Sequence, residues 1–492
     1  MNNRIKQLCF GCAVALTGAG VFSACQEPAP KDAIVVDFNE VHQTIDGFGL
    51  AEADWADDVF IFPNRDAVLE ALFGESGLKA NILRGEIFPH YSDDKGNFDF
   101  ALKSDTSLEV AQNPSKLERN DLLRRGQFWL TSHVQQKYPE TLFTFSVWSP
   151  PAWMKQDSHA TPMYPASGGS LRKDHYQSYA DYLTTFYKAF EEIGVKTYAI
   201  SPSNEPGYAA PWNSCVWSYD EMGDFIHNYL LPTFEKEKVG AKVLFGENPA
   251  WSTVFDKLKK ISSADFCNDL LKKYPLDNKR VIAAGHGYVL PDTLPLPAEL
   301  RRTPIIPFAE AQQKNIPMWV TEISDITPLD VSMKDGLYWA ASFQKYLMDA
   351  HVSALVWWCG AMPTKTNESL IVLDQQTGKF VLSKRYDVFG NYTRYIPVGS
   401  QCVDNQKVGL NDQVSVTTFR KDKGYTIVVV NEGDQPATCA LQLKGAKAVN
   451  QLNSYTTTEA DRWKAGQVAL KGDHYVLEIA PKSVVTYTGV VE

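Results

Sequence analysis

Downstream of Cys25, the sequence has no apolar run long enough to cross a membrane, which takes about 20 predominantly apolar residues. The segment before Cys25, MNNRIKQLCFGCAVALTGAGVFSA, places Arg4 and Lys6 ahead of a short apolar stretch that ends in small residues. This order is typical of a secretory signal. We therefore expect residues 1–24 to be a signal peptide and the protein to be exported.

The end of this segment carries a second signal. Phe22-Ser23-Ala24-Cys25 resembles a bacterial lipobox, with Phe where an aliphatic residue is usual. The resemblance implies that Cys25 is lipidated and that lipid alone anchors the protein to the bacterial envelope, at the outer membrane or cell surface. The alternative is an ordinary cleaved signal that leaves a free Cys25.

Cysteine is scarce and scattered, at eight residues in the whole chain. An odd number, five, follows Cys25 at wide spacing, which does not indicate a disulfide framework. The sequence also lacks HExxH, GxSxG and any cluster of His and Cys at metal-ligand spacing. We therefore expect neither a metal nor a cofactor.

Positive charge is in deficit, because 48 Lys and Arg stand against 58 Asp and Glu, for a net charge of −10. Such a surface repels nucleic acid and anionic polysaccharides at long range. We expect no nucleic-acid partner, and a neutral or weakly charged substrate is the easier one to bind. Aromatic residues are plentiful, with 12 Trp, 22 Tyr and 25 Phe, and they offer flat apolar faces for such a substrate.

Residues 44–396 alternate β-prone runs with longer amphipathic stretches such as DHYQSYADYLTTFYKAFEEIG. Eight such units are what a (β/α)8 TIM barrel, an α/β fold, requires. A doubly wound sheet is the alternative, but GFGLAE lacks the third glycine of a dinucleotide loop. The eight expected strands lie in IDGFGLAEA, KANILRGEIF, TLFTFSVWSPPAW, KTYAISPSNEP, AKVLFGENPAW, VIAAGHGYV, IPMWVTEISD and ALVWWCG.

Residues 397–492 change to period-two alternation with Gly and Asp turns and no long helix, for example QVSVTTFRKDKGYTIVVVNEG. This pattern predicts an appended β-sandwich. Residues 25–43 contain a short tether followed by the strand-like run AIVVDFNEVHQT, which we expect to pair with that sandwich.

Two carboxylates are placed for chemistry. Glu205 follows the fourth expected strand, in SPSNEP, and Glu322 ends the seventh, in WVTE. Functional side chains of such a barrel sit at the carboxyl ends of strands, so both acids should face one cleft. Two facing carboxylates can cut a glycosidic bond, one by protonating the leaving oxygen and the other by attacking the sugar or activating water. Other carboxylates compete for these roles, namely Glu52, Asp54, Glu86, Glu247 and Asp325.

Other residues near the expected rim suit the same site. Arg84 could hold a carboxylate ionised through paired hydrogen bonds, and His286 and Tyr288 could orient the nucleophile. Tryptophans supply flat faces for sugar rings, although each could equally pack in the core. The candidates are Trp148, Trp153, Trp212, Trp217, Trp357 and Trp358.

Together these residues carry a resemblance to glycoside hydrolase family 30. It implies a retaining enzyme with a barrel fused to a side β-sandwich that takes strands from both termini. On this resemblance Asn204-Glu205 is the acid/base element, with Asn204 bonding the substrate's 2-hydroxyl, and Glu322 is the nucleophile. Tyr208 and Trp212, just beyond, would hold the sugar. The motifs run in family order along the mature chain: QTIDGFG, SVWSPPAWMK, SPSNEP, HGY and WVTE.

The resemblance leaves the glycan open. YAISPSNEPGY and NSCVW are most similar to the xylanase-like branch, so the best expectation is endo-action on xylan or glucuronoxylan. That branch reads a glucuronate side group with an arginine in late barrel loops, whereas GAMPTKTNESLI offers only Lys365. The alternatives are a β-1,6-glucanase, a β-1,6-galactanase, a glucosylceramidase-like exo-glycosidase and, in another class, a non-catalytic glycan-binding surface lipoprotein.

Overall fold

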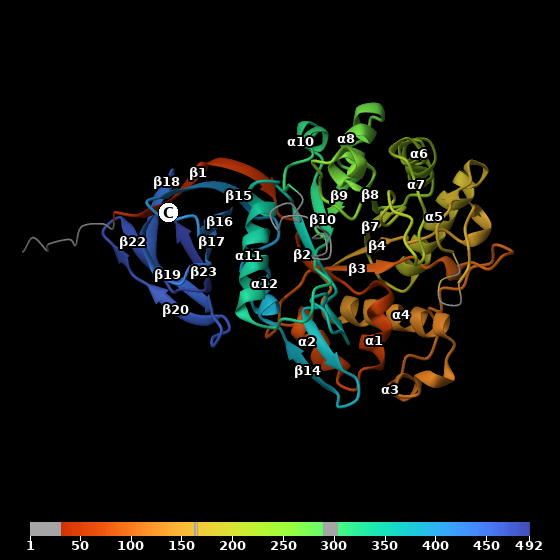
Figure 1. The fold of residues 1–492 in the computed structure, drawn as a ribbon, viewed down its shortest axis with the longest axis horizontal. Helices are drawn as coiled ribbons and strands as arrows, with labels where there is room; N and C mark the ends of the chain where they lie inside the picture. Colours follow the sequence, from red (N-terminus) through yellow and green to blue (C-terminus); the bar gives the residue numbers. More distant parts are fainter. Residues whose placement is uncertain (1–30, 162–163, 165, 289–303) are drawn as a thin grey trace, which may run out of the picture.

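Eight parallel strands form a closed barrel in the computed structural model of the protein (Figure 1). The structure describes residues 31–492 apart from 162–163, 165 and 289–303, so the expected signal segment and Cys25 lie outside the described residues. Each barrel strand falls inside one of the eight runs expected from the sequence, and the (β/α)8 prediction is confirmed. In chain order the strands are β2 (Gly47–Ala51), β3 (Ile82–Glu86), β4 (Leu142–Ser146), β7 (Thr197–Ser201), β8 (Lys242–Gly246), β9 (Val281–His286), β10 (Met318–Glu322) and β11 (Ala354–Trp358).

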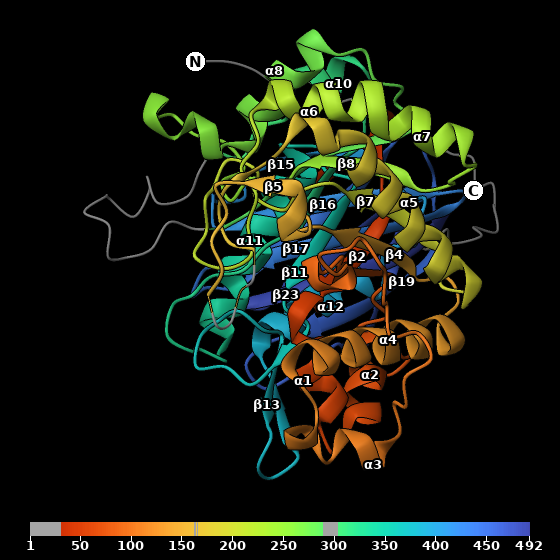
Figure 2. The same ribbon diagram turned by 90° about the vertical axis from the view of Figure 1, so that its right-hand side faces the viewer.

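Helices surround the barrel, as Figure 2 shows for α1 to α4 on one side and α5 to α8 on the other. They form because apolar residues recur at helical spacing, as in α5, where Tyr179, Leu183, Phe186 and Phe190 are buried. None of the helices in the described part of the chain is long and apolar enough to span a membrane. The helices are α1 (Ala56–Ile61), α2 (Arg65–Phe73), α3 (Leu108–Ala111), α4 (Arg119–Lys137), α5 (Tyr176–Glu192), α6 (Tyr219–Phe225), α7 (Leu231–Lys236), α8 (Ser263–Lys273), α10 (Ala309–Gln313), α11 (Met333–Met348) and α12 (Lys384–Thr393).

Apolar side chains from the strands fill the barrel interior. Side chains alternate along a strand, so Ile82 and Ile282, which point inward, direct Arg84 and His286 inward as well. On β10 the inward residue is Trp319, and strict alternation would turn Glu322 outward. The pairing of β10 with β9 shifts register between Val320 and Glu322, which inserts one extra residue. Because of this bulge, the side chain of Glu322 points into the barrel, as those of Arg84 and His286 do.

Ten strands form a second sheet beside the barrel (Figure 1). Its interior strand β1 (Ala33–Thr44) pairs antiparallel with β15 (Gln401–Val408) and parallel with β18 (Ala437–Lys444), as expected for an N-terminal contribution. β19 and β21 come from opposite halves of the sheet and contact each other, which closes the sheet around a core of its own. The remaining strands are β16 (Val414–Lys421), β17 (Gly424–Asn431), β19 (Ala448–Thr457), β20 (Lys464–Val468), β21 (Leu470–Lys471), β22 (His474–Ile479) and β23 (Ser483–Val491).

Helices α11 and α12 lie between the barrel and this sheet (Figure 1). Buried Asn391 on α12 donates to the Tyr455 carbonyl at 3.1 Å and to Thr486 Oγ1 at 3.0 Å, and it accepts from Thr457 Oγ1 at 2.6 Å. Because these buried polar atoms bond one another, they fix the two domains in one relative position. Short extra strands complete the chain, namely β5 (Lys155–Gln156) with β6 (Ser170–Leu171), and β12 (Ala361–Met362) with β13 (Ile371–Asp374) and β14 (Lys379–Leu382).

Candidate active site

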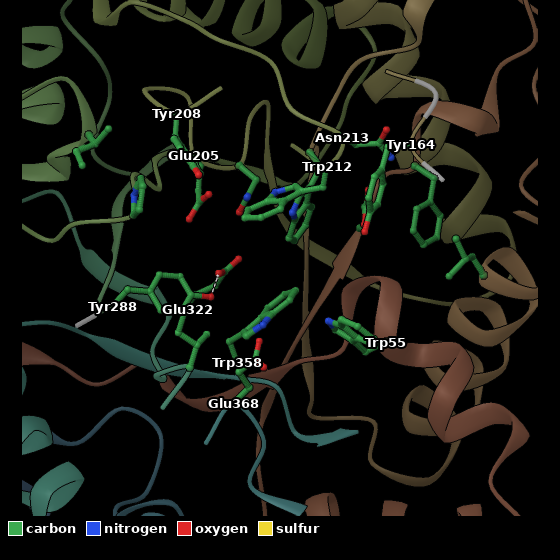
Figure 3. Close-up of a pocket in the computed structure, with 18 of the residues that line it drawn as sticks. Trp55, Tyr164, Glu205, Tyr208, Trp212, Asn213, Tyr288, Glu322, Trp358 and Glu368 are labelled. Carbon is green, nitrogen blue, oxygen red and sulfur yellow. Dashed lines mark hydrogen bonds between the residues drawn. The ribbon is translucent and has the colours of Figure 1, made fainter. Parts of the chain in front are cut away.

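Glu205 and Glu322 face each other across a pocket at the carboxyl end of the barrel (Figure 3). A carboxylate oxygen of each, together with a ring nitrogen of His286, lie within 4.8 Å of one another. Both side chains are almost fully buried, Glu205 at 7% exposure and Glu322 at 3%. The structure therefore brings together the two acids that the sequence placed at one rim.

The chain holds Glu205 in an unusual backbone conformation. Its φ is 46°, in the left-handed region that residues other than glycine seldom adopt. Its N–H donates to the carbonyl of Glu247 at 3.0 Å, and the N–H of Asn204 donates to the carbonyl of Val147 at 2.7 Å. These two bonds tie the segment after β7 to the neighbouring strand ends. Strain of this kind persists where the surroundings over-determine the conformation, typically at functional sites.

Arg84 is the buried cation of the site. Nη1 donates to Glu322 Oε1 at 2.6 Å, and Nη2 donates to Asn204 Oδ1 at 2.7 Å. Nε lies 3.2 Å from Glu247 Oε1 and 3.1 Å from Ser146 Oγ. A planar guanidinium can make several such bonds at once, so one side chain orients a carboxylate on each side of it and an amide.

Tyr288 and His286 complete the surroundings of the acids. The Tyr288 hydroxyl donates to Glu322 Oε2. Nδ1 of His286 lies 3.3 Å from Glu205 Oε1 and 3.4 Å from Glu322 Oε2, and the ring is fully buried. Burial, reinforced by Arg84, holds the pKa of His286 well below its usual value, so the ring is uncharged.

The two carboxyl groups differ in their electrostatic surroundings. Burial raises the pKa of Glu205 well above its usual range, and the charge on Glu322 raises it further. Burial also raises the pKa of Glu322, to about 7, but Arg84 and the Tyr288 hydroxyl oppose this rise. Because the direct cation and hydroxyl donor belong to Glu322, the proton shared by the pair resides on Glu205.

Arg84 also bears on whether a metal could bind here. His286, Glu205 and Glu322 offer three ligand atoms close enough for one cation. The guanidinium, however, already donates to Glu322 Oε1 and supplies the positive charge that this carboxylate needs. An added cation would lie beside Arg84 and be repelled by it. The donor set therefore suits a proton-transfer pair better than a metal site.

The pocket has a volume of about 490 Å³. Eight residues expected at the site line it, and Arg84 and His286 lie directly behind them. Trp148 and Trp358, which both line it, pack with ring centroids 5.8 Å apart, and the Arg84 guanidinium lies over the Trp148 ring. Tyr208 and Trp212 stand at its rim, 38% and 36% exposed. The eight are Trp148, Asn204, Glu205, Tyr208, Trp212, Tyr288, Glu322 and Trp358.

The expectation was wrong for three of the six tryptophans. Trp217 packs in the core against Tyr176 and Phe225, and Trp357 packs against Trp339, so their faces are not available to a sugar. Trp357 and Trp358 are neighbours on β11 and therefore point to opposite faces of the strand. Trp153 is half-buried with its ring edge against His175, and it does not line the pocket.

The competing carboxylates take several positions. Glu247 bonds Arg84 and Ser146, beneath the pair. Glu86 and Asp325 line the pocket. Glu52 is buried away from the lining and accepts the Ala361 N–H at 2.7 Å. The side chain of Asp54 lies outside the described residues.

Sequence reasoning missed several lining residues. Trp55 lies four residues past β2, close enough to a strand end to have been considered. Glu368 was overlooked although it lies in GAMPTKTNESLI, because it comes ten residues past the end of β11, on the wall beside Trp358 (Figure 3). The others are Phe88, His90, Arg119, Asn120, Leu123, Tyr164, Asn213, Pro249, Ala250, Ile261 and Ile326.

A parallel barrel with two buried acids of unequal surroundings at its carboxyl rim is the arrangement of the barrel glycoside hydrolases. The family model described as O-Glycosyl hydrolase family 30 matches residues 119–372, slightly more than half of the chain. The chain belongs to this family of glycoside hydrolases.

Curated relatives are distant. The putative glucosylceramidase 3 of Caenorhabditis elegans is 28% identical over 261 residues, which cover 47% of this chain and 46% of that protein. The matched region thus spans about half the length of this relative. Glucuronoxylanase XynC of Bacillus subtilis (strain 168) is 22% identical over 349 residues, covering 70% and 72%.

Solved structures agree on the fold. The catalytic domain of the family 30 xylanase C from Talaromyces cellulolyticus superposes with a TM-score of 0.72 and 20% identity. The superposition covers 94% of this chain and all of that domain. At this identity the likeness shows a shared fold, barrel and β-sandwich together.

Proposed function

We propose that the protein is a retaining β-glycosidase in which Glu205 is the acid/base and Glu322 the nucleophile. The observation that carries the proposal is the approach of their carboxylate oxygens to within 4.8 Å. Retaining enzymes hold the two groups about 5 Å apart, whereas inverting enzymes separate them by about 6.5–9.5 Å to admit a water. The Glu205–Glu322 approach matches the retaining separation.

In the first step Glu205 protonates the glycosidic oxygen while Glu322 attacks the anomeric carbon. Arg84 and Tyr288 keep Glu322 ionised and aimed through Oε1 and Oε2 respectively. The bond from the anomeric carbon to the leaving oxygen breaks, and an ester to Glu322 forms.

The second step uses the same asymmetry. Once Glu322 is esterified its negative charge is lost, so the repulsion that raised the pKa of Glu205 is removed. Glu205, now a carboxylate, takes a proton from water, and the water attacks the anomeric carbon. Glu322 leaves as a carboxylate that Arg84 stabilises.

Asn204 is oriented for substrate binding. Because its Oδ1 accepts from Arg84 at 2.7 Å, its amide nitrogen is the end left to donate to a sugar hydroxyl. Asn204 lines the pocket next to Glu205, which suits the 2-hydroxyl of the sugar under attack. A bond there that tightens in the transition state would contribute to catalysis.

The glycan is proposed to be a β-linked polysaccharide cut within the chain, with xylan as the first candidate. Aromatic residues on opposite walls, Trp55 and Trp358 against Tyr208 and Trp212, support binding of more than one sugar (Figure 3). β-1,6-Glucan, β-1,6-galactan and glucosylceramide are the alternatives. Product profiles on purified xylans, β-1,6-glucan and β-1,6-galactan test this choice, and release of monosaccharide alone would refute endo-action.

The mechanism has its own test, which does not depend on the glycan. Proton NMR of the first-formed product should show the β-anomer before mutarotation, and an α-anomer would refute the retaining assignment. A glycan-binding protein without catalysis would release no product at all. Such a protein has no need for an ionised acid beside a protonated one, which favours the enzyme.

Export and lipid anchoring through Cys25 stay predictions. If they hold, Cys25→Ser moves the protein from the membrane fraction to the soluble fraction of envelope preparations. An unchanged distribution would contradict the anchor.

A further inference from the structure

Two loops form one wall of the pocket. Residues 323–332 follow β10 and contribute Asp325 and Ile326, and residues 363–370 follow β12 and contribute Glu368. Figure 3 places Glu368 close to Trp358, across the pocket from Glu205. Neither Asp325 nor Glu368 has a part in the bond-breaking steps described above.

The two loops are joined by backbone pairing. The Asn367 N–H donates to the Thr327 carbonyl at 3.1 Å, and the Leu329 N–H donates to the Lys365 carbonyl at 2.9 Å. Pro328 and Thr366 form an antiparallel bridge between these bonds. The loops therefore behave as one unit.

A buried polar cluster fixes this unit to the helices behind it. Arg385 on α12 is fully buried and donates through Nη1 to Asp335 Oδ2 at 2.7 Å and to Asn367 Oδ1 at 3.1 Å. The same nitrogen donates to the Asp330 carbonyl at 2.7 Å, and Nε donates to the Ser369 carbonyl at 2.9 Å. One guanidinium thus holds both loops.

The cluster reaches Asp325 through a short relay, and it holds Asn367 and Ser369 on either side of Glu368. Nδ2 of Asn367 donates to Thr327 Oγ1 at 3.1 Å, and Thr327 donates from N at 2.9 Å and from Oγ1 at 2.5 Å to Asp325 Oδ1. On the other loop Thr366 Oγ1 donates to Glu368 Oε2 at 2.5 Å. Each carboxylate is therefore held by a hydroxyl on its own loop, with its position set by the buried cluster.

The charge of the pocket is predominantly negative. Five carboxyl side chains line it, of which Glu205 holds its proton, and among the lining residues that the structure describes the basic ones are Arg119 and His90. Arg84, behind the lining, pairs with Glu247 as well as with Glu322. Burial, with help from Arg124, lowers the pKa of His90 to about 3, so His90 adds no positive charge. Lys365, the basic residue that the late barrel loops offered for a uronate, is exposed and does not line the pocket.

We propose that Asp325 and Glu368, positioned by the Arg385–Asn367–Asp335 cluster, bind hydroxyl groups of an uncharged glycan and exclude chains that carry a uronate. Carboxylates only accept hydrogen bonds, which matches sugar hydroxyls as donors and repels a second carboxylate. This inference rests on the proposed function, because it assigns the substrate class of the same site.

Binding to matched sugar pairs tests the proposal without requiring turnover. The pairs are xylo-oligosaccharides with and without one glucuronosyl group, and aryl β-glucoside with aryl β-glucuronide, measured by calorimetry on Glu322→Gln. The neutral member of at least one pair should bind at least about tenfold more tightly at low salt, and the ratio should shrink at high salt. Tighter binding of the uronate member, or no binding of any member, overturns the proposal.

Variants then assign the selectivity to the two side chains. In the same background, Asp325→Asn with Glu368→Gln should bring the ratio towards one and weaken the neutral ligand by about tenfold, because charged hydrogen-bond acceptors are lost. Asp412→Asn with Glu40→Gln, an equal change of charge at two exposed positions of the β-sandwich, should change neither. An unchanged ratio in the double variant overturns the assignment.

The positioning role has a separate readout. In the otherwise native enzyme, Asn367→Ala should raise KM for the neutral substrate several-fold and leave kcat nearly unchanged, whereas the exposed Asn453→Ala should alter neither constant. A lower melting temperature with unchanged KM would overturn the positioning role.

If the wild type hydrolyses only uronate-bearing chains, the proposed function survives and this inference fails. If the wild type binds neutral glycans selectively but hydrolyses none, this inference survives and the proposed function fails.

Discussion

Arg84 Nη1 lies 2.6 Å from Glu322 Oε1, and no lysine or arginine makes such a contact with Glu205 in the part of the chain that the structure describes. This contact, with the hydroxyl that Tyr288 donates to Glu322, separates two acids that share one pocket and similar burial. A buried carboxylate is stable only with a partner charge or donors, so Glu322 is the acid that can stay ionised. Glu205 retains the proton and is therefore the group that donates it to the glycosidic oxygen.

Arg84→Lys should move the acid limb of the pH–kcat/KM profile to higher pH. Lysine keeps the charge but loses the fork that bonds Glu322, Asn204 and Glu247 together, so the pKa of Glu322 rises and less of it is ionised. We expect kcat/KM to fall by about 10²-fold at neutral pH, in the range of lost transition-state hydrogen bonds. Arg125→Lys, on the outer face of α4, is the matched control. A fall in activity with an unmoved acid limb would contradict this account.

Glu205→Gln should remove the alkaline limb of activity on aryl glycosides with good leaving groups. These substrates need no proton at the leaving oxygen, whereas cleavage of the natural glycan should drop by about 10²–10⁴-fold. Retained alkaline inhibition in the variant would show that another group titrates in that limb.

The same substitution should change the pH dependence of stability. The folded pKa of Glu205 lies above its unfolded value of about 4.3, so its contribution is fully present below that pH and is lost as pH rises through the folded pKa. Glutamine does not titrate, so the melting temperature of Glu205→Gln should gain on the wild type as pH rises across this window. The exposed Glu40→Gln should show no such trend. If the melting temperatures of Glu205→Gln and the wild type differ by the same amount at every pH, the raised pKa of Glu205 is contradicted.

Trp212→Ala should weaken binding of long substrates more than it slows chemistry. Trp212 and Tyr208 meet edge to face at 6.0 Å beside Glu205, the acid next to the leaving group. Losing about 1 kcal/mol of ring contact should raise KM about fivefold on a polysaccharide and leave a small aryl glycoside almost unaffected. Tyr219→Ala, equally exposed on α6, is the control. Equal effects on both substrates would place Trp212 outside the leaving-group side of the pocket.

Asn391→Ala should destabilise the enzyme without altering its active site. The side chain joins α12 to β19 and β23 through three buried hydrogen bonds, and leaving their partners unpaired costs about 1–3 kcal/mol. Thermal unfolding should begin at lower temperature while kcat/KM of the folded enzyme is kept. Asn453→Ala, exposed on β19, should leave the unfolding curve unchanged from that of the wild type. An unchanged unfolding curve for Asn391→Ala would refute the role of this interface.

The barrel could be predicted from the sequence because strands buried on both faces read as short apolar runs that end in polar residues. The direction of individual side chains could not. Glu322 points inward only because of the register shift after Val320, and no residue pattern announces that shift. Trp357 and Trp358 are adjacent and chemically identical, yet one packs in the core and the other lines the pocket.

The sequence also could not predict that Glu368 lies in the pocket wall beside Trp358. Glu368 reaches the pocket through a loop whose position depends on Arg385, and Arg385 acts through Asp335 and Asn367, which are distant in sequence. Hydrogen bonds between residues that are distant in sequence depend on the folded chain, and the local residue pattern does not predict them. Glu205, Glu322 and Arg84 could be found because each lies at or just past the end of a barrel strand.

The most direct test of the account is chemical rescue of Glu322→Gly. Removing the nucleophile should stop hydrolysis, and azide, occupying the vacated space, should restore turnover of an activated aryl β-glycoside. Because azide then attacks in the place of Glu322, the product should be the α-glycosyl azide, with inverted configuration. A β-glycosyl azide, or hydrolysis that persists without azide, would contradict the assignment of Glu322 and with it the proposed mechanism.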